Sequence, residues 1–333
     1  MLLNFAIIGC GSIAERHAKQ IGLCGGILIA CCDIDKAKAE NFALKHLIRY
    51  YQSAEEMLYN ENNVAVVAIC SPNGLHYKHS ILALAAEKHV VCEKPMALYV
   101  DHCQKMIDLA FNKQRKLFMV MQNRFNPPVM ELKKIIDNNL LGSIYNVHLS
   151  CFWNRDANYY KESSWKGTKE LDGGVLYTQF SHFIDILLWL FGAVETVQSI
   201  IDNFKHPGIE IEDSGVIILK FTNKILCTIN YSVNAYNKNY EGSLTVIGEN
   251  GIIKVGGQYL NKLEFCNINN YIPAILENGS EENNYGNYTG SMSNHHLVYE
   301  NVMNVFNNKA DIATTGAEGL KTVELIRKIY QTA

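Results

Sequence analysis

Residues 5–14 read FAIIGCGSIA, an apolar run that leads directly into a turn built on glycine and alanine. The apolar run has the composition of a short buried β-strand. The turn follows the pattern Gly-x-Gly-x-x-Ala through Gly9, Gly11 and Ala14, and a helical pattern comes after it. A strand, this turn and a helix, in that order, form the context in which the pattern binds a dinucleotide. The stretch therefore predicts the start of a dinucleotide-binding domain.

Each position of the turn has a physical role in such a domain. Gly9 permits the tight turn, Gly11 lets the backbone approach a pyrophosphate, and Ala14 is small enough for close packing of helix on strand. Ser12 and Ile13 open the helix, whose N-terminal amides and partial positive charge attract phosphates. We therefore predict that these five residues hold the cofactor.

Asp33 indicates which cofactor is bound. It ends the second apolar run, 19 residues after Ala14. A carboxylate there accepts hydrogen bonds from both ribose hydroxyls of NAD and repels the additional phosphate of NADP. Asp35 competes for this role, and the alternative is a cap on the helix predicted over 35–45. We predict NAD, held at its ribose by Asp33.

The first 120 residues repeat the alternation of strand and helix. Their apolar runs cover residues 5–9, 27–32, 64–70, 89–93 and 117–122, and helical patterns lie between them. Near-continuous apolar strands separated by helices indicate a parallel sheet that is covered on both faces. The fold class is therefore α/β, and residues 1–122 are predicted to form a Rossmann domain with a doubly wound parallel sheet.

The pattern changes after Gly142. Strands of alternating polarity follow, and one long helix over 175–191 precedes most of them. We therefore predict that residues 123–333 form an α/β domain, with an open, mostly antiparallel sheet, for substrate binding and oligomerisation. The final helices, near 294–307 and 316–331, are expected to pack back on the first domain. An exposed apolar sheet face is costly, so we predict a homo-oligomer, either a dimer or a tetramer.

The composition narrows the class of protein. The chain has 333 residues, of which 48% are hydrophobic and 19% charged, and a formal net charge of −3 without a basic block. These values are ordinary for a soluble globular protein and give no sign of nucleic-acid binding. No apolar run could span a bilayer, and the apolar N-terminus lacks a basic leader, so we expect a cytoplasmic protein without a membrane partner. Ten scattered cysteines without a Cys-x-x-Cys pair favour reduced thiols over disulfides or zinc.

A second motif, Glu93-Lys94-Pro95, lies where the fourth apolar run ends. Proline restricts the residue before it, so Lys94 is biased to a fixed, extended conformation. A lysine at the carboxyl end of a strand points into the cofactor crevice, where its ammonium group can stabilise charge that develops on a substrate oxygen. The alternative is a solvated lysine in a loop, and the spacing alone does not decide between them.

Three motifs together resemble one family. The turn at 9–14, the turn Ser71-Pro72-Asn73 followed by His76, and Glu93-Lys94-Pro95 are similar to motifs of the Gfo/Idh/MocA oxidoreductases. The resemblance extends over essentially the whole chain. It implies a Rossmann domain paired with an α/β domain on an open sheet, and an NAD-dependent dehydrogenase that acts on CH–OH groups.

The resemblance also implies roles for single residues. Lys94 matches the catalytic lysine of the family, and Glu93 would approach the nicotinamide ribose. Gln122, Asn123 and Arg124 match the family's next motif at the cleft. The cofactor contacts implied outside the glycine-rich turn and Asp33 are Ser71, Asn73, His76, Glu93, Lys94 and Gln122.

Residues 171–192, LDGGVLYTQFSHFIDILLWLFG, carry another group of signals. Asp172 and the two glycines after it predict a cap on the long helix, on which Thr178 and His182, four apart, share a face. A lone helical histidine is by itself more often a packed core residue. The family's usual signature here is Asp-x-x-x-His, which implies that His182 is the general acid and base. Thr178 stands in place of the Asp and cannot ionise, so the proton relay would rest on His182, Lys94 and the substrate.

The threonine and the flanking stretches YYKESSWKGT and TQFSHFID narrow the resemblance. They are similar to bacterial UDP-N-acetylglucosaminuronic acid 3-dehydrogenases of surface polysaccharide biosynthesis, which oxidise C3 of a nucleotide sugar with NAD. The substrate-binding residues implied are Lys94, Arg155, Tyr159, Tyr160, Ser164, Trp165, Lys166, Thr168, Thr178 and His182. Arginine and lysine suit a carboxylate or diphosphate, and aromatic rings suit sugar and uracil faces. The alternative is a structural loop before a capped core helix.

Two other functions stay open. An inositol or simple sugar dehydrogenase of the same family would keep Lys94 and His182 and need no nucleotide pocket. A non-catalytic, NAD-binding regulatory protein would be compatible with a threonine at position 178. The histidine pairs 76/79 and 295/296 lack a carboxylate or cysteine at ligand spacing, so we predict no metal.

Overall fold

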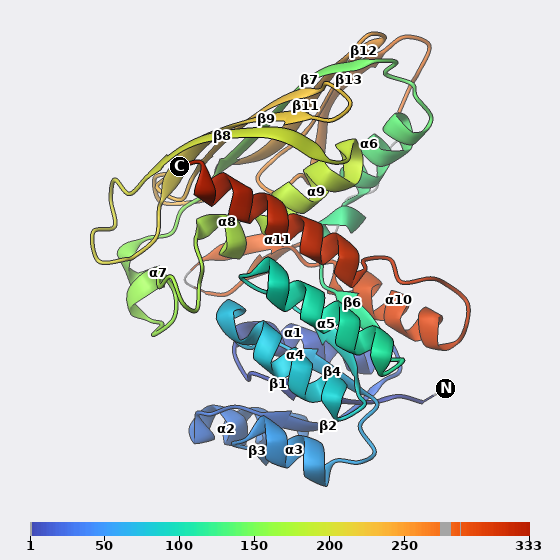
Figure 1. The fold of residues 1–333 in the computed structure, drawn as a ribbon, viewed down its shortest axis with the longest axis vertical. Coiled ribbons are helices and arrows are strands. Elements are labelled where there is room, and N and C mark those ends of the chain that lie inside the picture. Colours follow the sequence, from blue (N-terminus) through green and yellow to red (C-terminus); the bar gives the residue numbers. More distant parts are fainter. Residues whose placement is uncertain (1, 274–280, 287) are drawn as a thin grey trace. The chain divides into compact units, whose positions relative to one another are not determined.

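The structure, a computed structural model of the chain, describes residues 2–273, 281–286 and 288–333. It divides into two compact units, drawn as a ribbon in Figure 1. The first unit comprises residues 1–121 and 295–324, and the second comprises residues 122–294 and 325–333. Helix α11 (Gly316–Gln331) supplies residues to both.

The first unit is built on a parallel sheet with the strand order β3-β2-β1-β4-β5-β6. Its strands are β1 (Asn4–Ile8), β2 (Ile27–Cys32), β3 (Arg49–Tyr51), β4 (Val66–Ile69), β5 (His89–Cys92) and β6 (Leu117–Met119). All neighbouring strands run parallel, so their carboxyl ends share one edge of the sheet. The doubly wound parallel sheet predicted from the apolar runs is confirmed. The strand order reverses between β1 and β4, which is where ligands bind in such sheets.

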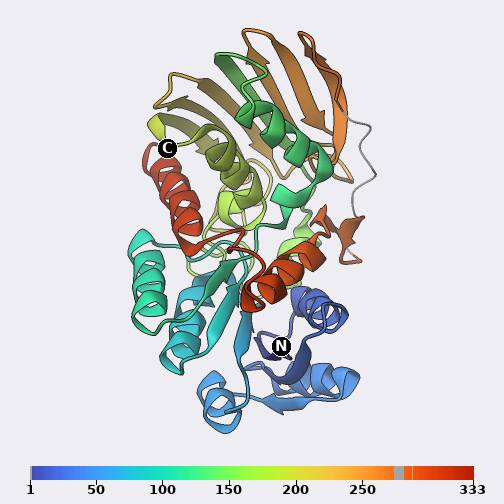
Figure 2. The ribbon, with the colours of Figure 1, turned by 90° about the vertical axis from the view of Figure 1, so that its right-hand side faces the viewer.

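Helices pack on both faces of this sheet (Figure 2). They are α1 (Ser12–Leu23), α2 (Lys36–His46), α3 (Ala54–Asn60), α4 (His76–Ala85), α5 (Val100–Asn112) and α10 (His295–Phe306), with the 3₁₀ turn η1 (Asn73–Leu75) before α4. Side-chain caps fix two helix starts, because Asp35 accepts hydrogen bonds from the first amides of α2 and Ser53 accepts one from α3. Helix α10 packs on α1 although it lies far along the chain. It thereby brings residues near 295 to the helix that follows the glycine-rich turn.

The second unit is built on a wide sheet with the order β13-β12-β11-β7-β10-β9-β8. Its strands are β7 (Ile144–Phe152), β8 (Val194–Asp202), β9 (Ser214–Phe221), β10 (Leu226–Ser232), β11 (Glu241–Gly248), β12 (Gly251–Gly256) and β13 (Lys262–Ile268). Strands β7 and β10 run parallel, and the other neighbours run antiparallel. The predicted open, mostly antiparallel sheet is therefore confirmed. A separate hairpin pairs β14 (Glu282–Asn284) with β15 (Thr289–Met292).

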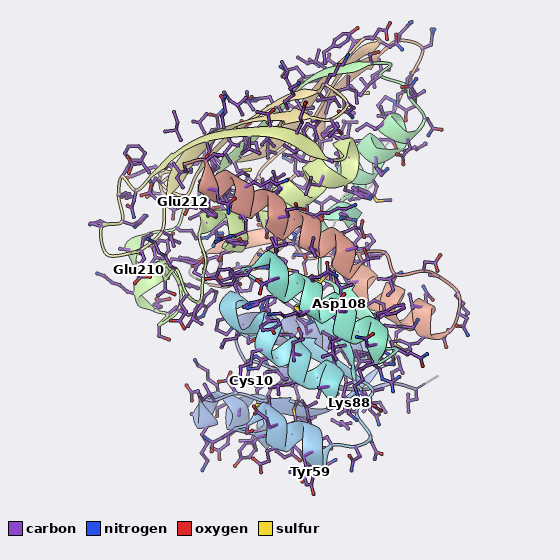
Figure 3. All side chains as sticks on the ribbon, in the orientation of Figure 1. Cys10, Tyr59, Lys88, Asp108, Glu210 and Glu212 are labelled. Atoms are coloured by element: carbon purple, nitrogen blue, oxygen red, sulfur yellow. The ribbon has the colours of Figure 1, made fainter. Side chains whose placement is uncertain are left out.

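One face of this sheet carries the core of the unit, and the other is open. The helical elements are η2 (Gln122–Phe125), α6 (Pro127–Asp137), α7 (Ala157–Lys161), α8 (Val175–Thr178) and α9 (Ser181–Phe191). On β9, Ile217 and Leu219 are fully buried, whereas Val216 and Ile218 are 48% and 49% exposed. This alternation is expected of a strand with one covered face, and side chains project from the open face in Figure 3. Among the described residues, no helix combines the length and apolar character needed to cross a membrane.

Candidate active site

The glycine-rich turn joins β1 to α1 in the conformation that its residues require. Gly9 has a φ of +94°, and a Cβ there would lie 2.6 Å from the Ser71 backbone nitrogen, so only glycine fits. Gly11 is the N-cap of α1, and no atom of the described residues lies within 4 Å of where its Cβ would be. The first turn of α1 thus presents its amide groups beside a space that a pyrophosphate can enter.

Asp33 lies next to this turn, directly after β2. Its Oδ2 accepts a hydrogen bond from the amide of Cys10 at 2.8 Å, and its Oδ1 accepts one from the amide of Asp35 at 2.9 Å (Cys10 is labelled in Figure 3). Asp35 is the N-cap of α2, so the competing capping role belongs to Asp35. The half-buried Asp33 carboxylate is thereby held beside the turn, which is where the predicted ribose contact requires it.

Two more turns at the same sheet edge, after β4 and β5, are joined by His76. Its ring nitrogens lie 2.6 Å from the carbonyl oxygen of Pro95 and 2.8 Å from that of Ser71. The ring is buried, and burial lowers the pKa of its imidazole. His76 therefore links the turn that carries Asn73 to the turn that carries Lys94. The cofactor contacts predicted for these residues stay predictions.

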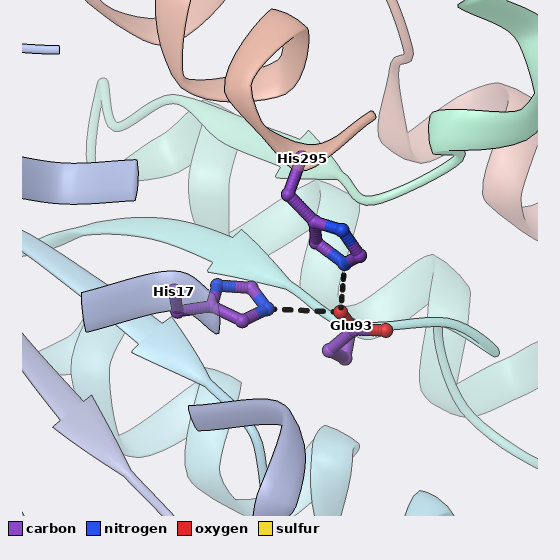
Figure 4. A group of neighbouring side chains, drawn as sticks. All are labelled: His17, Glu93 and His295. Atoms are coloured by element: carbon purple, nitrogen blue, oxygen red, sulfur yellow. Dashed lines mark hydrogen bonds and ion pairs between the residues drawn. The ribbon is translucent and has the colours of Figure 1, made fainter. Parts of the chain in front are cut away.

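Glu93 lies at the centre of a buried polar cluster (Figure 4). Its Oε1 is 2.9 Å from Nε2 of His17 and 3.4 Å from Nε2 of His295, and its Oε2 accepts a hydrogen bond from the Lys94 amide at 3.1 Å. The other ring nitrogen of His17 is 2.6 Å from the hydroxyl of Tyr299. Burial alone would raise the pKa of the Glu93 carboxyl, but the hydrogen bond from His17 and the nearby ring of His295 outweigh it and hold that pKa well below its usual range.

Sequence reasoning missed this cluster, because its members lie far apart in the chain and share no spacing. Among the residues that the structure describes, His17, Glu93 and His295 are the set whose ligand atoms could reach one metal ion. The 2.9 Å separation between His17 and Glu93 is that of a hydrogen bond. The second oxygen of Glu93 is bonded to the backbone beside it, so the cluster as it stands is hydrogen-bonded.

In the second unit, Arg155 is buried and bonded to neutral groups. It follows β7 with 1% of its surface exposed. Its guanidinium donates to Gln179 Oε1 at 2.9 Å, to Asn239 Oδ1 at 3.3 Å and to the Thr289 carbonyl at 3.2 Å. Within the described residues, no ion pair balances this charge. Aromatic rings lie over the guanidinium, those of Trp153, Tyr159 and Tyr288.

Lys166 adds a second cation at the same place. Its Nζ lies 3.8 Å from the ring centre of Tyr159 and 4.8 Å from that of Tyr288. Burial, and then the neighbouring Arg155, lower the pKa of the ammonium group to about 8. The carboxylate that acts most on this lysine is Asp172, whose own pKa burial raises to about 6. Glu162, which is exposed, acts on the lysine more weakly, so Asp172 is the one buried carboxylate beside the two cations.

The single helix predicted over 175–191 is wrong, because the structure breaks it into α8 and α9. The break lies at Gln179, whose side chain accepts the hydrogen bond from Arg155 and donates another at 2.7 Å to a tyrosine hydroxyl. These long-range bonds fix Gln179 between the two helices. Thr178 ends α8 and His182 lies in the first turn of α9, so the two do not share one continuous helical face.

The start of α8 also differs from the prediction. Gly174 is the N-cap, but the first two amides of α8 donate to Oε1 of Glu212, at 3.0 and 3.4 Å, rather than to Asp172. The hydroxyl of Tyr330 donates to the same oxygen at 2.6 Å, and burial raises the pKa of the Glu212 carboxyl to about 7. Asp172 instead accepts hydrogen bonds from the Thr178 hydroxyl and, at 2.8 Å, from the amide of residue 167.

The turn η2 carries the motif Gln122-Asn123-Arg124. Arg124 forms a buried two-point ion pair with Asp185 of α9, with distances of 2.7 and 2.6 Å, which fixes η2 to α9. Gln122 donates to Ser291 at 3.2 Å, but its Oε1 and both amide atoms of Asn123 are buried without a hydrogen-bond partner among the described residues. Buried amide groups of this kind indicate bound water or ligand. The cofactor contact predicted for Gln122 stays a prediction.

The remaining predicted substrate residues lie in the same loop. Tyr160 is buried against Tyr159, Ser164 is exposed, and the hydroxyl of Thr168 donates to the Trp165 carbonyl at 2.7 Å and closes a local turn. Their substrate contacts stay predictions. Sequence reasoning missed three residues around Arg155, namely Gln179, Asn239 and Tyr288. They lie in a helical pattern and in turns, where no periodicity marks them.

Two family profiles match the chain. Residues 3–121 match the NAD-binding Rossmann fold of an oxidoreductase family, and residues 129–254 match the GFO/IDH/MocA C-terminal domain. Together the two profiles account for most of both units.

Solved structures and curated relatives agree with these profiles. The WlbA dehydrogenase from Bordetella pertussis, in complex with NADH and UDP-GlcNAcA, has a TM-score of 0.90 and 31% identity and covers 100% of this chain and 97% of its own. The WlbA dehydrogenase from Chromobacterium violaceum, with the same ligands, has a TM-score of 0.88 and 33% identity over 99% of this chain and 93% of its own. The 2,7-anhydro-N-acetylneuraminate hydratase of Escherichia coli is 31% identical over 77% of this chain and 68% of its own.

Proposed function

The chain belongs to the Gfo/Idh/MocA oxidoreductase family, and from this premise we propose that it oxidises C3 of a UDP-N-acetylhexosaminuronic acid with NAD. The predicted family, enzyme class and cofactor are confirmed, since the first unit matches an NAD-binding domain and both WlbA structures contain NADH. The nucleotide sugar of the proposal comes from UDP-GlcNAcA in those structures. Such a reaction would serve surface polysaccharide biosynthesis.

The observation that carries the proposal is the positive charge of the buried Arg155 and the half-buried Lys166. Burying a cation costs free energy unless an opposite charge or hydrogen bonds compensate it. Arg155 has only neutral acceptors, and the Lys166 ammonium group donates no hydrogen bond within the described residues. An anionic ligand would supply the missing charge, and the surrounding tyrosine rings suit a sugar or uracil face. An acidic nucleotide sugar has both features, whereas inositol has no anion.

The first unit fits the cofactor. The space beside Gly11 admits a pyrophosphate, the amides of α1 face it, and Asp33 is held next to the turn. When bound there, NAD supplies the acceptor for a hydride. These features agree with the family match, and they favour NAD over NADP because the carboxylate would repel a ribose phosphate.

The reaction needs one hydride and one proton to leave the substrate. We assign Lys94 to the C3 oxygen, where its ammonium group donates a hydrogen bond as carbonyl character develops. We assign His182 as the base that accepts the hydroxyl proton. The C–H bond at C3 then yields its hydride to the nicotinamide, the O–H bond yields its proton to the imidazole, and the carbon becomes a ketone.

A carboxylate lies beside Thr178, although threonine replaces the family's Asp at this position. The Thr178 hydroxyl donates to the carboxylate of Asp172, which the same segment carries. The negative charge that the family's Asp would carry at position 178 is therefore carried by Asp172, to which the Thr178 hydroxyl is hydrogen-bonded. This arrangement weakens the case for a regulatory protein without turnover.

We also propose that a second copy of the chain covers the open sheet face of the second unit. Ile200 is 78% exposed there, and Val216 and Ile218 are 48% and 49% exposed, with Ile200 opposite Val216 on neighbouring strands. A patch of this kind is costly in water. Replacing Ile218 with glutamate should convert the oligomer to monomer in light scattering, with the thermal unfolding midpoint measured alongside. A native protein that is already monomeric would contradict the proposal.

A substrate panel tests the function directly. NADH formation should appear with UDP-N-acetylglucosaminuronic acid and be absent with myo-inositol. Turnover of inositol alone would favour the second dehydrogenase, which the relatives named inositol 2-dehydrogenase represent at 25% identity. No turnover with any substrate, despite NAD binding, would favour the regulatory protein.

The anion site has its own matched test. Lys166→Met should weaken binding of UDP-N-acetylglucosaminuronic acid by about 10- to 100-fold, the loss expected when a hydrogen bond to a charged group is removed. Lys169→Met is the control, because that lysine is exposed in the same loop. If the native protein and the Lys166 variant bound UDP-N-acetylglucosaminuronic acid with equal affinity, Lys166 would not bind an anion, and the proposed substrate class would lose its support. Titration with UDP alone then tells whether the lysine binds the diphosphate or the sugar carboxylate.

A further inference from the structure

The buried cluster around Glu93 connects three segments of the first unit that the proposed mechanism uses only in part. His17 belongs to α1, the helix that follows the glycine-rich turn, and His295 opens α10. Glu93 itself directly precedes the lysine assigned to the substrate oxygen. These segments lie far apart in the chain, so their convergence on one carboxylate is a property of the fold.

We propose that His17 is a positioning residue for Lys94 and acts through Glu93. The inference rests on the proposed function, since it requires that Lys94 acts on the substrate. His17 holds Oε1 of Glu93 at 2.9 Å, and this contact leaves Oε2 directed at the Lys94 amide, 3.1 Å away. The backbone of the lysine is thereby tied, through one carboxylate, to the helix that we predict to bind the cofactor phosphates.

Burial makes this link rigid. His17 and His295 have no exposed surface, and Glu93 has 6%. Water therefore cannot replace a lost donor easily, and a buried carboxylate without its donors is costly. Tyr299 fixes the other side of the imidazole, because its hydroxyl lies 2.6 Å from Nδ1 and its ring packs edge-on against that of His17. The cluster can thus hold one orientation of Glu93 without help from solvent.

A second tie reaches the same turn from the opposite side. His76 contacts the carbonyl oxygen of Pro95, the residue after Lys94, at 2.6 Å. The amide of Lys94 is held by Glu93, and the carbonyl of Pro95 is held by His76 in the ring tautomer that carries its proton on Nδ1. Both bonds come from buried side chains, so the backbone on either side of the lysine is fixed by groups outside the turn. Displacement of a catalytic group by about 1 Å can cost on the order of 10²-fold in rate, which is the loss such fixation prevents.

Two variants of His17 separate positioning from general stability. His17→Leu removes the donor to Glu93, whereas the amide of His17→Gln can still donate to Oε1. We expect His17→Leu to lower kcat by on the order of 10-fold or more, with the NAD dissociation constant changed less than about threefold. His17→Gln should recover most of kcat. His46→Leu is the matched control, because His46 also makes a histidine–glutamate contact to α1, at 3.1 Å, but to Glu15 and not to Glu93.

A second readout does not depend on turnover. Hydrogen exchange of a peptide that includes Lys94 should quicken in His17→Leu and stay near the native rate in His17→Gln and His46→Leu. The inference is overturned if His17→Leu keeps native kcat, or if His17→Gln loses as much kcat as His17→Leu. It is also overturned if the purified protein contains one equivalent of a metal that is lost in the His17 variants, since the cluster would then be a metal centre. If Lys94→Ala retains native kcat, the proposed function fails first, whatever the His17 variants show.

Discussion

Replacing Asp33 with asparagine should change which nicotinamide cofactor the protein prefers. The substitution removes the charge and the acceptor of the Asp35 amide, but it keeps one side-chain oxygen that can accept the hydrogen bond from the Cys10 amide, now 2.8 Å from Oδ2. The turn should therefore keep its shape, and the difference should lie in the interaction with the ribose. The native protein is expected to bind NAD at least tenfold more tightly than NADP, about 1.4 kcal/mol.

The size of the effect follows from Coulomb's law. At about 4 Å, a carboxylate repels one unit of phosphate charge by about 4 kcal/mol at an effective dielectric of about 20, and by about 1 kcal/mol in bulk water. Asp33 is half-buried, so we expect a value between these limits, about 1.5 to 3 kcal/mol. The variant should therefore lose most of its discrimination against NADP. It should also bind NAD about five- to tenfold more weakly, because hydrogen bonds to a neutral acceptor are about half as strong as those to a carboxylate.

Calorimetric titration of native and variant proteins with both cofactors measures these changes. Asp35→Asn is the control, because Asp35 caps α2 and asparagine is an equally good N-cap. Its affinities for NAD and NADP should stay within about twofold of the native values. An unchanged NAD to NADP ratio in Asp33→Asn, or the same change in Asp35→Asn, would refute the role given to Asp33.

Three further substitutions test the second unit. His182→Asn should lower kcat by about 10²- to 10⁴-fold while the protein still binds NAD. A kcat within tenfold of the native value would show that another group is the general base. Thr178→Val removes a hydrogen-bond donor to Asp172, whose pKa is about 6. The free energy of unfolding should fall by about 1.5–3 kcal/mol at pH 8, and by less at pH 5, where the Asp172 carboxyl is protonated. An equal loss at both pH values would contradict this expectation. Glu212→Gln should flatten the pH dependence of unfolding. Because the folded pKa of Glu212 is raised from 4.5 to about 7, its contribution is fully present below pH 4.5 and is lost, by about 3 kcal/mol, as the pH rises through 7. Denaturant titrations of the native protein and Glu212→Gln at pH 4.5 and 8 measure this. If both proteins lost the same free energy of unfolding between the two pH values, the Glu212 carboxyl would not be responsible.

The fold was predictable because its signals are local. The runs at 27–32 and 89–93 are apolar on both faces, as strands of a covered parallel sheet must be, and both form strands in the structure. The turn at 9–14 carries its own conformational requirement, a positive φ at Gly9. The strand β13, which the apolar pattern did not reveal, has mostly exposed side chains at the edge of the sheet.

The details of the site were less predictable because long-range contacts decide them. The apolar spacing through 175–191 is the same with or without a break, and the break coincides with Gln179, which accepts a long-range hydrogen bond from Arg155. His17 and Glu93 are 76 residues apart, and no spacing rule connects them. Motif and family resemblance therefore predicted roles for Lys94 and His182, but not the groups that hold their surroundings in place.

The account depends most on Lys94 as the group that stabilises charge on the substrate oxygen. The measurement that tests it is steady-state oxidation of UDP-N-acetylglucosaminuronic acid by Lys94→Ala, followed through NADH absorbance, with NAD affinity determined on the same preparation. The account predicts that kcat falls by on the order of 10²–10³-fold while the NAD dissociation constant changes less than about threefold. A variant that keeps native kcat and only raises KM would show that Lys94 binds substrate without taking part in the reaction.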